Sequence, residues 1–570
     1  APAGGWPTRV QHPLYRIALV WTVVMVLVLG WLAVTRGIPR SPESGVMGTG
    51  LEVPLHVGLL VLLLAGVLLA ARFHVAGAVV VALAATLLGY ASSVEYAPWV
   101  AVLLTVAGFV PALLLWVQWH RVASPRAALT LAALTSALLV GLVYLAATNY
   151  TYYWGPTHPT SATPAPDDDV VEWMWSGAVT PTSVTVRART AGDAARVRLA
   201  VSTRPTLDAA RYSPARPSRA ADDNIVSLTV SGLAPGRDHY YALEVDGVLD
   251  TARVGRVTTF PRGPASFTFA VAGDSRTGSN GQVYDAVRRT DPLFYLNVGD
   301  FFYGDVDRND RALYLRQYQA NLTAPAQAAL YARAPIAYIW GDHDFASNDA
   351  DSTAPGRPAS LAVYRQVVPH YALPSGRQAP IFQAFTVGDV RFVLTDNRSR
   401  RDPPGEAARS MLGRAQLRML QRELDGADRY GLLVWANADP WVDRADPTTD
   451  TWGGFAVERR RISRMIAASD VRNLLAVSGD AHMLAYDDGS HTDYSGTGRA
   501  GFPLFQAAAL DRKPSVKGGP YTGPVIPGGG QFGLVHVRDD GRTVRVSMDG
   551  MNWRGEQLFR RTFTVTRGGS

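Results

Sequence analysis

The feature that most constrains this chain is a repeated ending of short apolar runs between residues 266 and 480. Four such runs end in a Gly-Asp pair, namely Gly273-Asp274, Gly299-Asp300, Gly341-Asp342 and Gly479-Asp480. Short apolar runs separated by longer amphipathic stretches are typical of an α/β domain. Because strand ends form the ligand crevice of such a sheet, we expect the four carboxylates to converge there.

Other polar residues follow the same runs or similar ones. They are Tyr303, His343, Asp396, Arg398, Asn437 and His482. Several carboxylates brought together repel one another unless cations lie between them. A single Asp after a strand can simply start a turn, but four of them, joined by two histidines and a tyrosine, favour metal-assisted hydrolysis.

In order along the chain, these residues form a set of motifs that resembles a known family. The motifs are Gly-Asp-x-x-Tyr at 299–303, Trp-Gly-Asp-His-Asp at 340–344, Leu-x-Asp-x-Arg at 394–398, Asp-x-Trp-x-Gly-Phe at 450–455 and Ser-Gly-Asp-x-His at 478–482. The set is similar to PhoD-like alkaline phosphatases, which are calcineurin-like metallophosphoesterases related to purple acid phosphatases. The resemblance runs from about residue 170 to the C-terminus.

The resemblance implies a site with two metal ions and a role for each motif residue. Asp300 would bridge the metals. One metal would be completed by Asp274, Tyr303 and His482, and the other by Asp342 and Asp480. Asn437, where the superfamily often has a histidine, would be a further metal ligand. By resemblance, the phenolate of Tyr303 favours Fe(III) at the first position. The oxygen-rich second position suits Ca, Mg or Mn better than Zn alone.

The expected activity is hydrolysis of phosphate mono- or diesters by a metal-activated water. His343 would protonate the leaving oxygen or stabilise the charge on it, with Asp344 orienting its ring. Arg398 is expected to clamp the phosphate, although a salt bridge with Asp396 is an equal alternative. Arg276, next to the first ligand, is a second candidate for substrate binding.

The first quarter of the chain has a different composition. Five apolar segments, at 17–34, 54–71, 75–92, 98–117 and 127–147, have the length of membrane spans. Arginine is richer in the connections on the N-terminal side, which predicts a multi-pass cell-membrane protein with a cytoplasmic N-terminus and an extracytoplasmic catalytic domain. Membrane lipids are then expected partners, and a lipid or polyprenyl phosphate is a candidate substrate.

The expected architecture has four parts. It comprises a five-helix transmembrane region at 1–149, a linker at 150–169, a fibronectin type III-like β sandwich at 170–262, and an α/β metallophosphoesterase domain at 263–570 with two mixed sheets flanked by helices. The Gly- and Pro-rich stretch 494–530 is expected to wall the active site.

Composition excludes several other functions. The chain has no cysteine, which rules out disulfides, thiolate ligands and cysteine nucleophiles. The net charge is +7, but no basic run interleaved with aromatic residues points to nucleic acid. The rival hypothesis is a membrane-bound interaction protein with a degenerate phosphoesterase domain, whose substituted positions would be Arg276 and Asn437.

Overall fold

The computed structural model describes residues 12–34, 52–95, 98–120, 170–404, 408–507 and 509–567. By contacts, the chain divides into two compact units, Ala1–Tyr153 and Trp154–Ser570. Each unit is described by itself. The fifth apolar segment, at 127–147, and the linker at 150–169 lie outside the described residues.

The N-terminal unit is a set of helices. They are α2 (Pro13–Val34), α3 (Glu52–Ala70), α4 (His74–Glu95) and α5 (Pro98–His120). Over the described residues, no helix offers an apolar stretch long enough to cross a membrane. The prediction of a five-helix transmembrane region is therefore wrong, and so is the multi-pass cell-membrane location derived from it.

Part of the physical reason is that an apolar side chain can be buried against other helices as well as in lipid. In this unit the four helices bury side chains against one another, including Ala18, Leu63, Val67, Ala85 and Leu115. The expected membrane-lipid partners and lipid-linked substrate rested only on the spans, so the structure gives them no support.

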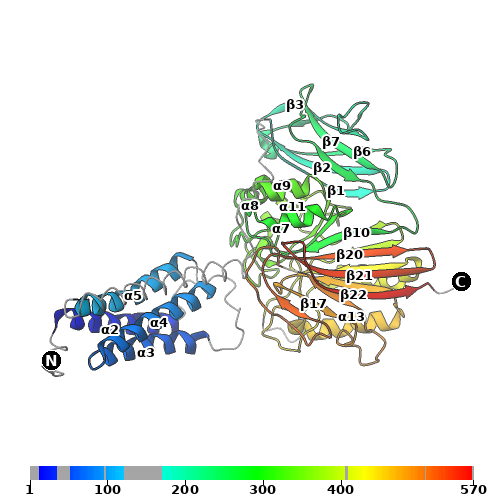
Figure 1. Ribbon diagram of the computed structural model, residues 1–570. Coiled ribbons are helices and arrows are strands. Elements are labelled where there is room, and N and C mark those ends of the chain that lie inside the picture. Colours follow the sequence, from blue (N-terminus) through cyan, green and yellow to red (C-terminus); the bar gives the residue numbers. More distant parts are fainter. Residues whose placement is uncertain are drawn as a thin grey trace. The chain divides into compact units, whose positions relative to one another are not determined.

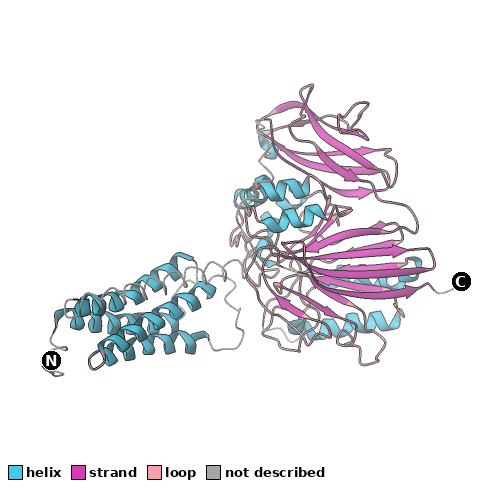
Figure 2. Ribbon diagram, viewed as in Figure 1, coloured by secondary structure: helices cyan, strands magenta, loops and turns pink. Residues whose placement is uncertain are grey.

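The second unit is built on two large sheets (Figure 1, Figure 2). The first sheet has the order β22 (Gln557–Thr566), β21 (Thr543–Asn552), β20 (Gln531–Asp539), β10 (Phe267–Ala272), β11 (Tyr295–Val298), β12 (Ile336–Ile339), β1 (Val171–Thr180), β2 (Ser183–Thr190), β6 (Ile225–Ser231). The second has the order β13 (Gln383–Val387), β14 (Val390–Leu394), β15 (Leu432–Ala436), β16 (Leu474–Ser478), β18 (Leu504–Ala507), β17 (Met483–Asp487), β19 (Val525–Pro527).

The α-helices of this unit and three short 3-10 helices connect the strands. The α-helices are α7 (Gln282–Arg289), α8 (Arg311–Thr323), α9 (Pro325–Tyr331), α10 (Asp342–Phe345), α11 (Arg357–Val367), α12 (Gly413–Asp425) and α13 (Ala456–Ala468). The 3-10 helices are η1 (Ala220–Asp222), η2 (Ala427–Arg429) and η3 (Trp452–Phe455).

Three apolar cores give the unit its layers. Between the two sheets, Phe269 of β10 meets Phe392 of β14, with ring centroids 5.3 Å apart. On the other face of the first sheet, Tyr338 packs with Tyr364 of α11. On the other face of the second sheet, Trp435 belongs to a core shared with α12 and α13. The order is therefore helices, sheet, sheet, helices.

Residues 170–262 form two sheets, but one of them continues into the first large sheet. Strands β3 (Ala194–Ser202) and β7 (Asp238–Val245) carry the short strands β4 (Arg211–Tyr212), β5 (Arg216–Ser218), β8 (Val248–Leu249) and β9 (Gly255–Thr258). Strand β1 instead pairs in parallel with β12, where Gly177 faces Ile336. A Cβ on Gly177 would lie 2.6 Å from the carbonyl oxygen of Ile336, so glycine permits this pairing.

The strands that precede the Gly-Asp pairs run in the same direction within each sheet. Strands β10, β11 and β12 are mutually parallel, and so are β14, β15 and β16. Their carboxyl ends therefore open at the same edge of each sheet. The stretch 494–530, expected to wall the active site, contains β18 and β19, and its residues 511–517 lie beside this edge.

Candidate metal centre

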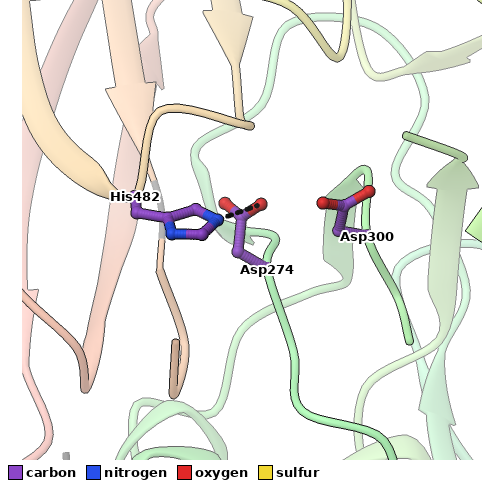
Figure 3. A group of neighbouring side chains, drawn as sticks. All are labelled: Asp274, Asp300 and His482. Atoms are coloured by element: carbon purple, nitrogen blue, oxygen red, sulfur yellow. Dashed lines mark ion pairs between the residues drawn. The ribbon is translucent and has the colours of Figure 1, made fainter. Parts of the chain in front are cut away.

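The first part of the centre lies at the ends of β10 and β11 (Figure 3). Asp274, Asp300 and His482 are buried, and one ligand atom from each lies within 4.8 Å of the others. The Nε2 atom of His482 lies 3.5 Å from Oδ1 of Asp274. The phenol oxygen of Tyr303 joins them, 3.2 Å from the same Asp274 oxygen and 2.9 Å from His482 Nε2.

The orientation of His482 suits a metal ligand. Its Nδ1 atom lies 2.8 Å from the carbonyl oxygen of Lys513, which can only accept a hydrogen bond. Nδ1 therefore carries the proton, and the lone pair of Nε2 points toward Tyr303 and Asp274. A backbone partner of this kind commonly fixes the tautomer of a metal-binding histidine.

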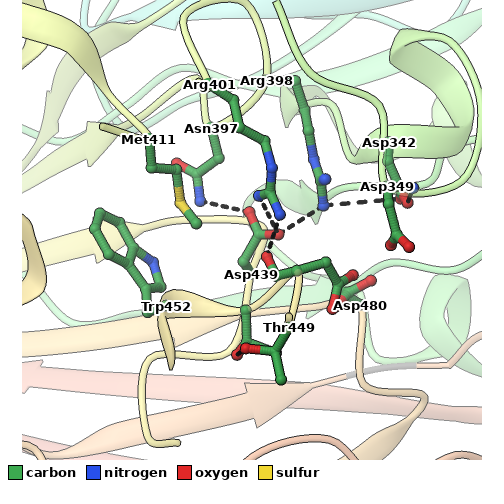
Figure 4. Close-up of polar contacts among 12 residues, drawn as sticks. Asp342, Asp349, Asn397, Arg398, Arg401, Met411, Asp439, Thr449, Trp452 and Asp480 are labelled. Carbon is green, nitrogen blue, oxygen red and sulfur yellow. Dashed lines mark hydrogen bonds and ion pairs between the residues drawn. The ribbon is translucent and has the colours of Figure 1, made fainter. Parts of the chain in front are cut away.

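The second part of the centre is a group of carboxylates that we call the acidic group (Figure 4). Its members are Asp342, Asp349, Asp439, Asp450 and Asp480. Asp342, Asp349 and Asp450 place oxygens within 4.8 Å of one another, and so do Asp439, Asp450 and Asp480. Asp300 and Asp342 also form such a set with His343, so Asp300 lies between the two parts.

The buried carboxylates fit cations. Burial raises the pKa of Asp274 to about 7, and burial together with the charge of Asp342 raises the pKa of Asp300 well above its usual range. The Oδ2 atom of Asp274 and the Oδ1 atom of Asp342 are buried and have no hydrogen-bond partner. Such oxygens cost free energy unless a cation or a donor meets them.

His343 is paired with a carboxylate other than the expected one. Its Nδ1 atom lies 2.6 Å from Oδ1 of Asp305. Asp344 instead accepts hydrogen bonds from the Phe301 amide and the Tyr338 hydroxyl. Burial acts to lower the pKa of His343, but the carboxylates of Asp342, Asp300 and Asp305 raise it to about 10.

Arg398 forms an ion pair other than the expected one with Asp396, and its role as a phosphate clamp stays a prediction. Its guanidinium is fully buried and lies 2.6 Å from Oδ1 of Asp439 and 3.9 Å from Asp342 (Figure 4). The guanidinium of Arg401 lies 3.4 Å from the same oxygen of Asp439. Asp396 accepts a hydrogen bond from the backbone amide of Arg398. No ion pair joins the two side chains, so the alternative salt bridge is absent.

Two further predicted residues are held by neighbours. Asn437 is fully buried, and its side-chain oxygen accepts a hydrogen bond from the indole of Trp452 at 3.0 Å. The backbone amide of Arg276 donates to Asp511 at 2.6 Å. Neither contact assigns a ligand or substrate role, so both roles stay predictions.

The backbone at the strand ends is strained. Asp274, Asp300 and Asp480 have positive φ values of 58°, 49° and 67°, and His482 has 47°. Non-glycine residues rarely adopt this left-handed conformation, and where they cluster they indicate a functional constraint.

Comparison with known proteins places the centre in a family. Residues 269–510, which contain the carboxylates and histidines described above, match the sequence model of the PhoD-like phosphatases. We call residues 269–510 the PhoD-like domain, after the family that they resemble. Alkaline phosphatase D of Bacillus subtilis (strain 168) is 24% identical over 338 residues, or 50% of this chain. That match covers 57% of the relative, so this chain spans little more than half of its length.

Two solved structures share the fold of most of this chain. A structure of PhoD superposes with a TM-score of 0.58 at 17% identity, covering 72% of this chain and 92% of that one. A purple acid phosphatase from seeds of yellow lupin (Lupinus luteus) superposes with a TM-score of 0.50 at 13% identity, covering 71% and 75%. At these identities the likeness concerns the fold.

Most residues predicted from the motifs of the PhoD-like domain are thus brought together. No site role was predicted for Asp305, Asp349, Asp439, Asp450 or Lys517. Asp305 comes two residues after Tyr303, so the Gly-Asp-x-x-Tyr motif extended by two would have included it. Lys517 lies in the stretch 494–530 and carries no motif signal.

Proposed function

We propose that the protein is a metal-dependent phosphoesterase that hydrolyses phosphate mono- or diesters at this centre. The observation that carries the proposal is the set of buried carboxylates at neighbouring strand ends, two of whose oxygens lack any hydrogen-bond partner. The match to the PhoD-like family over 269–510 supports the same reaction.

The ligand assignment follows the two parts of the centre. Asp274, Tyr303 and His482 would hold one cation, Asp342 and Asp480 would hold the other, and Asp300 would contact both. When bound, such cations supply positive charge for phosphate oxygens and lower the pKa of a water molecule. A phenol, an imidazole and carboxylates suit iron at the first position, and an all-oxygen set suits Ca, Mg or Mn at the second.

The proton needed by the leaving oxygen would come from His343. Its imidazole is buried beside Asp300 and Asp342, and its pKa of about 10 keeps it protonated at neutral pH in the cation-free protein. Asp305 holds Nδ1 at 2.6 Å, which leaves Nε2 as the atom that would donate. Asp305, not Asp344, is therefore our positioning residue for His343.

Hydrolysis of p-nitrophenyl phosphate and of bis(p-nitrophenyl) phosphate tests the proposal. Asp300→Asn keeps the shape of the side chain but removes its charge, and we expect kcat/KM to fall by more than about 100-fold. Asp470→Asn, in an exposed ion pair with Arg472, is the matched control and should keep the wild-type rate. Unchanged activity in Asp300→Asn, or no activity of the wild type on either ester with Fe, Ca or Mn supplied, would reject the function.

A further inference from the structure

The chain uses lysine and arginine very unequally. The chain has 55 lysines and arginines, and only two of them, Lys513 and Lys517, are lysines. Both lie in the segment 511–517, beside the candidate metal centre. A guanidinium is a planar fork, whereas an ammonium is a compact point charge. A chain that uses arginine almost everywhere else therefore has a compact cation at this place.

Lys517 contacts the acidic group directly. Its Nζ atom lies 2.9 Å and 3.0 Å from the two oxygens of Asp480, and 3.2 Å from Oδ2 of Asp450. Asp480 is 7% exposed, so few water molecules can replace these contacts. The ammonium thereby occupies both oxygens of a carboxylate that our proposed function assigns to the second cation.

The positive charges in the acidic group are divided between two places. Arg398 and Arg401 both lie against Asp439, on one side of the group. Lys517 contacts the carboxylates of Asp450 and Asp480, while Arg401 reaches Asp450 only at its backbone carbonyl oxygen. The buried Oδ1 atom of Asp342 has no hydrogen-bond partner, and its ion pair with Arg398 is long, at 3.9 Å.

A divalent cation would need the same oxygens. Calcium takes six to eight oxygen ligands and magnesium takes six, so a cation in this group would draw on Asp480 and its neighbours. An ammonium and a divalent cation in contact with the same carboxylate oxygens repel each other. One of them must give way when the other takes both oxygens of Asp480.

We propose that Lys517 is a tethered competitor of the second cation, its ammonium holding the oxygens of Asp480 and Asp450 until a divalent cation displaces it. The proposal rests on the proposed function, because it takes the second cation position from there. It makes Lys517 a residue that sets the cation affinity of the site, and it couples cation binding to the position of the segment 511–517.

Calorimetric titration of the full chain, freed of metal, with Ca²⁺ and separately with Mn²⁺ tests the competition. Lys517→Gln should bind the second cation about tenfold more tightly than the wild type, a gain of about 1.4 kcal/mol. Lys517→Arg keeps the charge and should bind no more tightly than the wild type. Arg472→Gln removes an exposed charge from an ion pair elsewhere and should leave the affinity unchanged.

The thermal unfolding of the same proteins gives a second readout. Without cations, Lys517→Gln leaves Asp450 and Asp480 without their ammonium, so its Tm should fall below that of the wild type. Saturating Ca²⁺ should raise the Tm of Lys517→Gln more than that of the wild type. If Lys517→Gln binds either cation equally or more weakly, the competition is wrong.

Because the chain has only two lysines, the competition can also be tested in the wild-type protein, where no folding defect of a variant interferes. Reductive methylation with ¹³C-formaldehyde labels the two lysines and the terminal amine while keeping the positive charge. The signal that disappears in Lys517→Gln belongs to Lys517 and should shift when Ca²⁺ is added. A signal that stays in place while calorimetry records binding would overturn the competition alone; absence of cation binding in every variant would reject the proposed function as well.

Discussion

Among single residues, Tyr303 makes the first prediction about metal identity. Its phenol oxygen lies 2.9 Å from His482 Nε2 and 3.2 Å from Asp274 Oδ1, within reach of one shared ion. If that ion is Fe(III), the iron-loaded protein should show a phenolate charge-transfer band in the visible spectrum. Tyr303→Phe should abolish the band, and Tyr212→Phe, an exposed tyrosine on β4, should retain it. A band that survives Tyr303→Phe would remove Tyr303 from the ligand set.

Asp439 makes a prediction about stability. It is fully buried and neutralises Arg398 at 2.6 Å and Arg401 at 3.4 Å. Removing one partner leaves the other charges buried and unpaired, so Asp439→Ala should lower the free energy of unfolding by about 3–5 kcal/mol. Asp470→Asn removes the charge from an exposed pair, and its free energy of unfolding should stay close to that of the wild type in the same denaturant titration. Equal losses would mean that Asp439 is not the counter-ion of the two arginines.

At this scale, the sequence predicted the residues that directly follow a strand and missed those whose positions depend on the path of a loop. Asp274, Asp300, Asp342 and Asp480 could be predicted because strand direction alone brings their side chains to one edge. The pairing of His343 with Asp305 in place of Asp344 could not, since it depends on how the chain turns after Tyr303. The position of Lys517 depends on a loop without a repeating pattern.

Among the structural elements, the strand ends depend on glycine for close approach. A Cβ on Gly341 would lie 2.1 Å from Oδ1 of Asp300, so the glycine of one strand end makes room for the carboxylate of the next. Gly341→Ala should displace Asp300 and lower kcat/KM by more than about tenfold, with the fold retained.

Gly192→Ala is the matched control, because a Cβ there has no heavy atom within 4 Å. It should leave both the aryl phosphatase rate and the Tm near the wild-type values. A full wild-type rate in Gly341→Ala would show that Asp300 does not need the position that it has in this structure.

The strands themselves could largely be predicted from the sequence. The apolar runs before Asp274, Asp300 and Asp342 form β10, β11 and β12, and the run before Asp480 forms β16. The helices of the first quarter were misread, because hydropathy measures the need for burial and not whether lipid or protein meets it.

At the scale of the whole molecule, the sheet that joins β1 to β12 makes residues 170–262 part of the fold of the second unit. Trp175 of β1 packs against Phe301 and Tyr331, with centroids 5.5 Å and 5.8 Å apart, and its indole donates to the carbonyl oxygen of Val367. These contacts cross the boundary at residue 262 that the sequence predicted.

We therefore expect a fragment of residues 154–570 to unfold in one cooperative thermal transition. A fragment of residues 263–570 would expose the partners of Trp175 and the edge of β12, so it should lack a cooperative transition or melt at a much lower temperature. Calorimetry of the two fragments measures this difference. Similar transitions in both would show that residues 170–262 form an independent domain.

The central claim is that the strand ends of the PhoD-like domain hold two metal ions that share Asp300. Elemental analysis of protein loaded with excess Fe, Ca and Mn and then freed of unbound metal tests it most directly. The wild type and the control Asp470→Asn should each retain two equivalents of metal per chain, and Asp300→Asn should lose at least one. A wild type that retains no metal, or an Asp300→Asn protein that retains both equivalents, would contradict the claim.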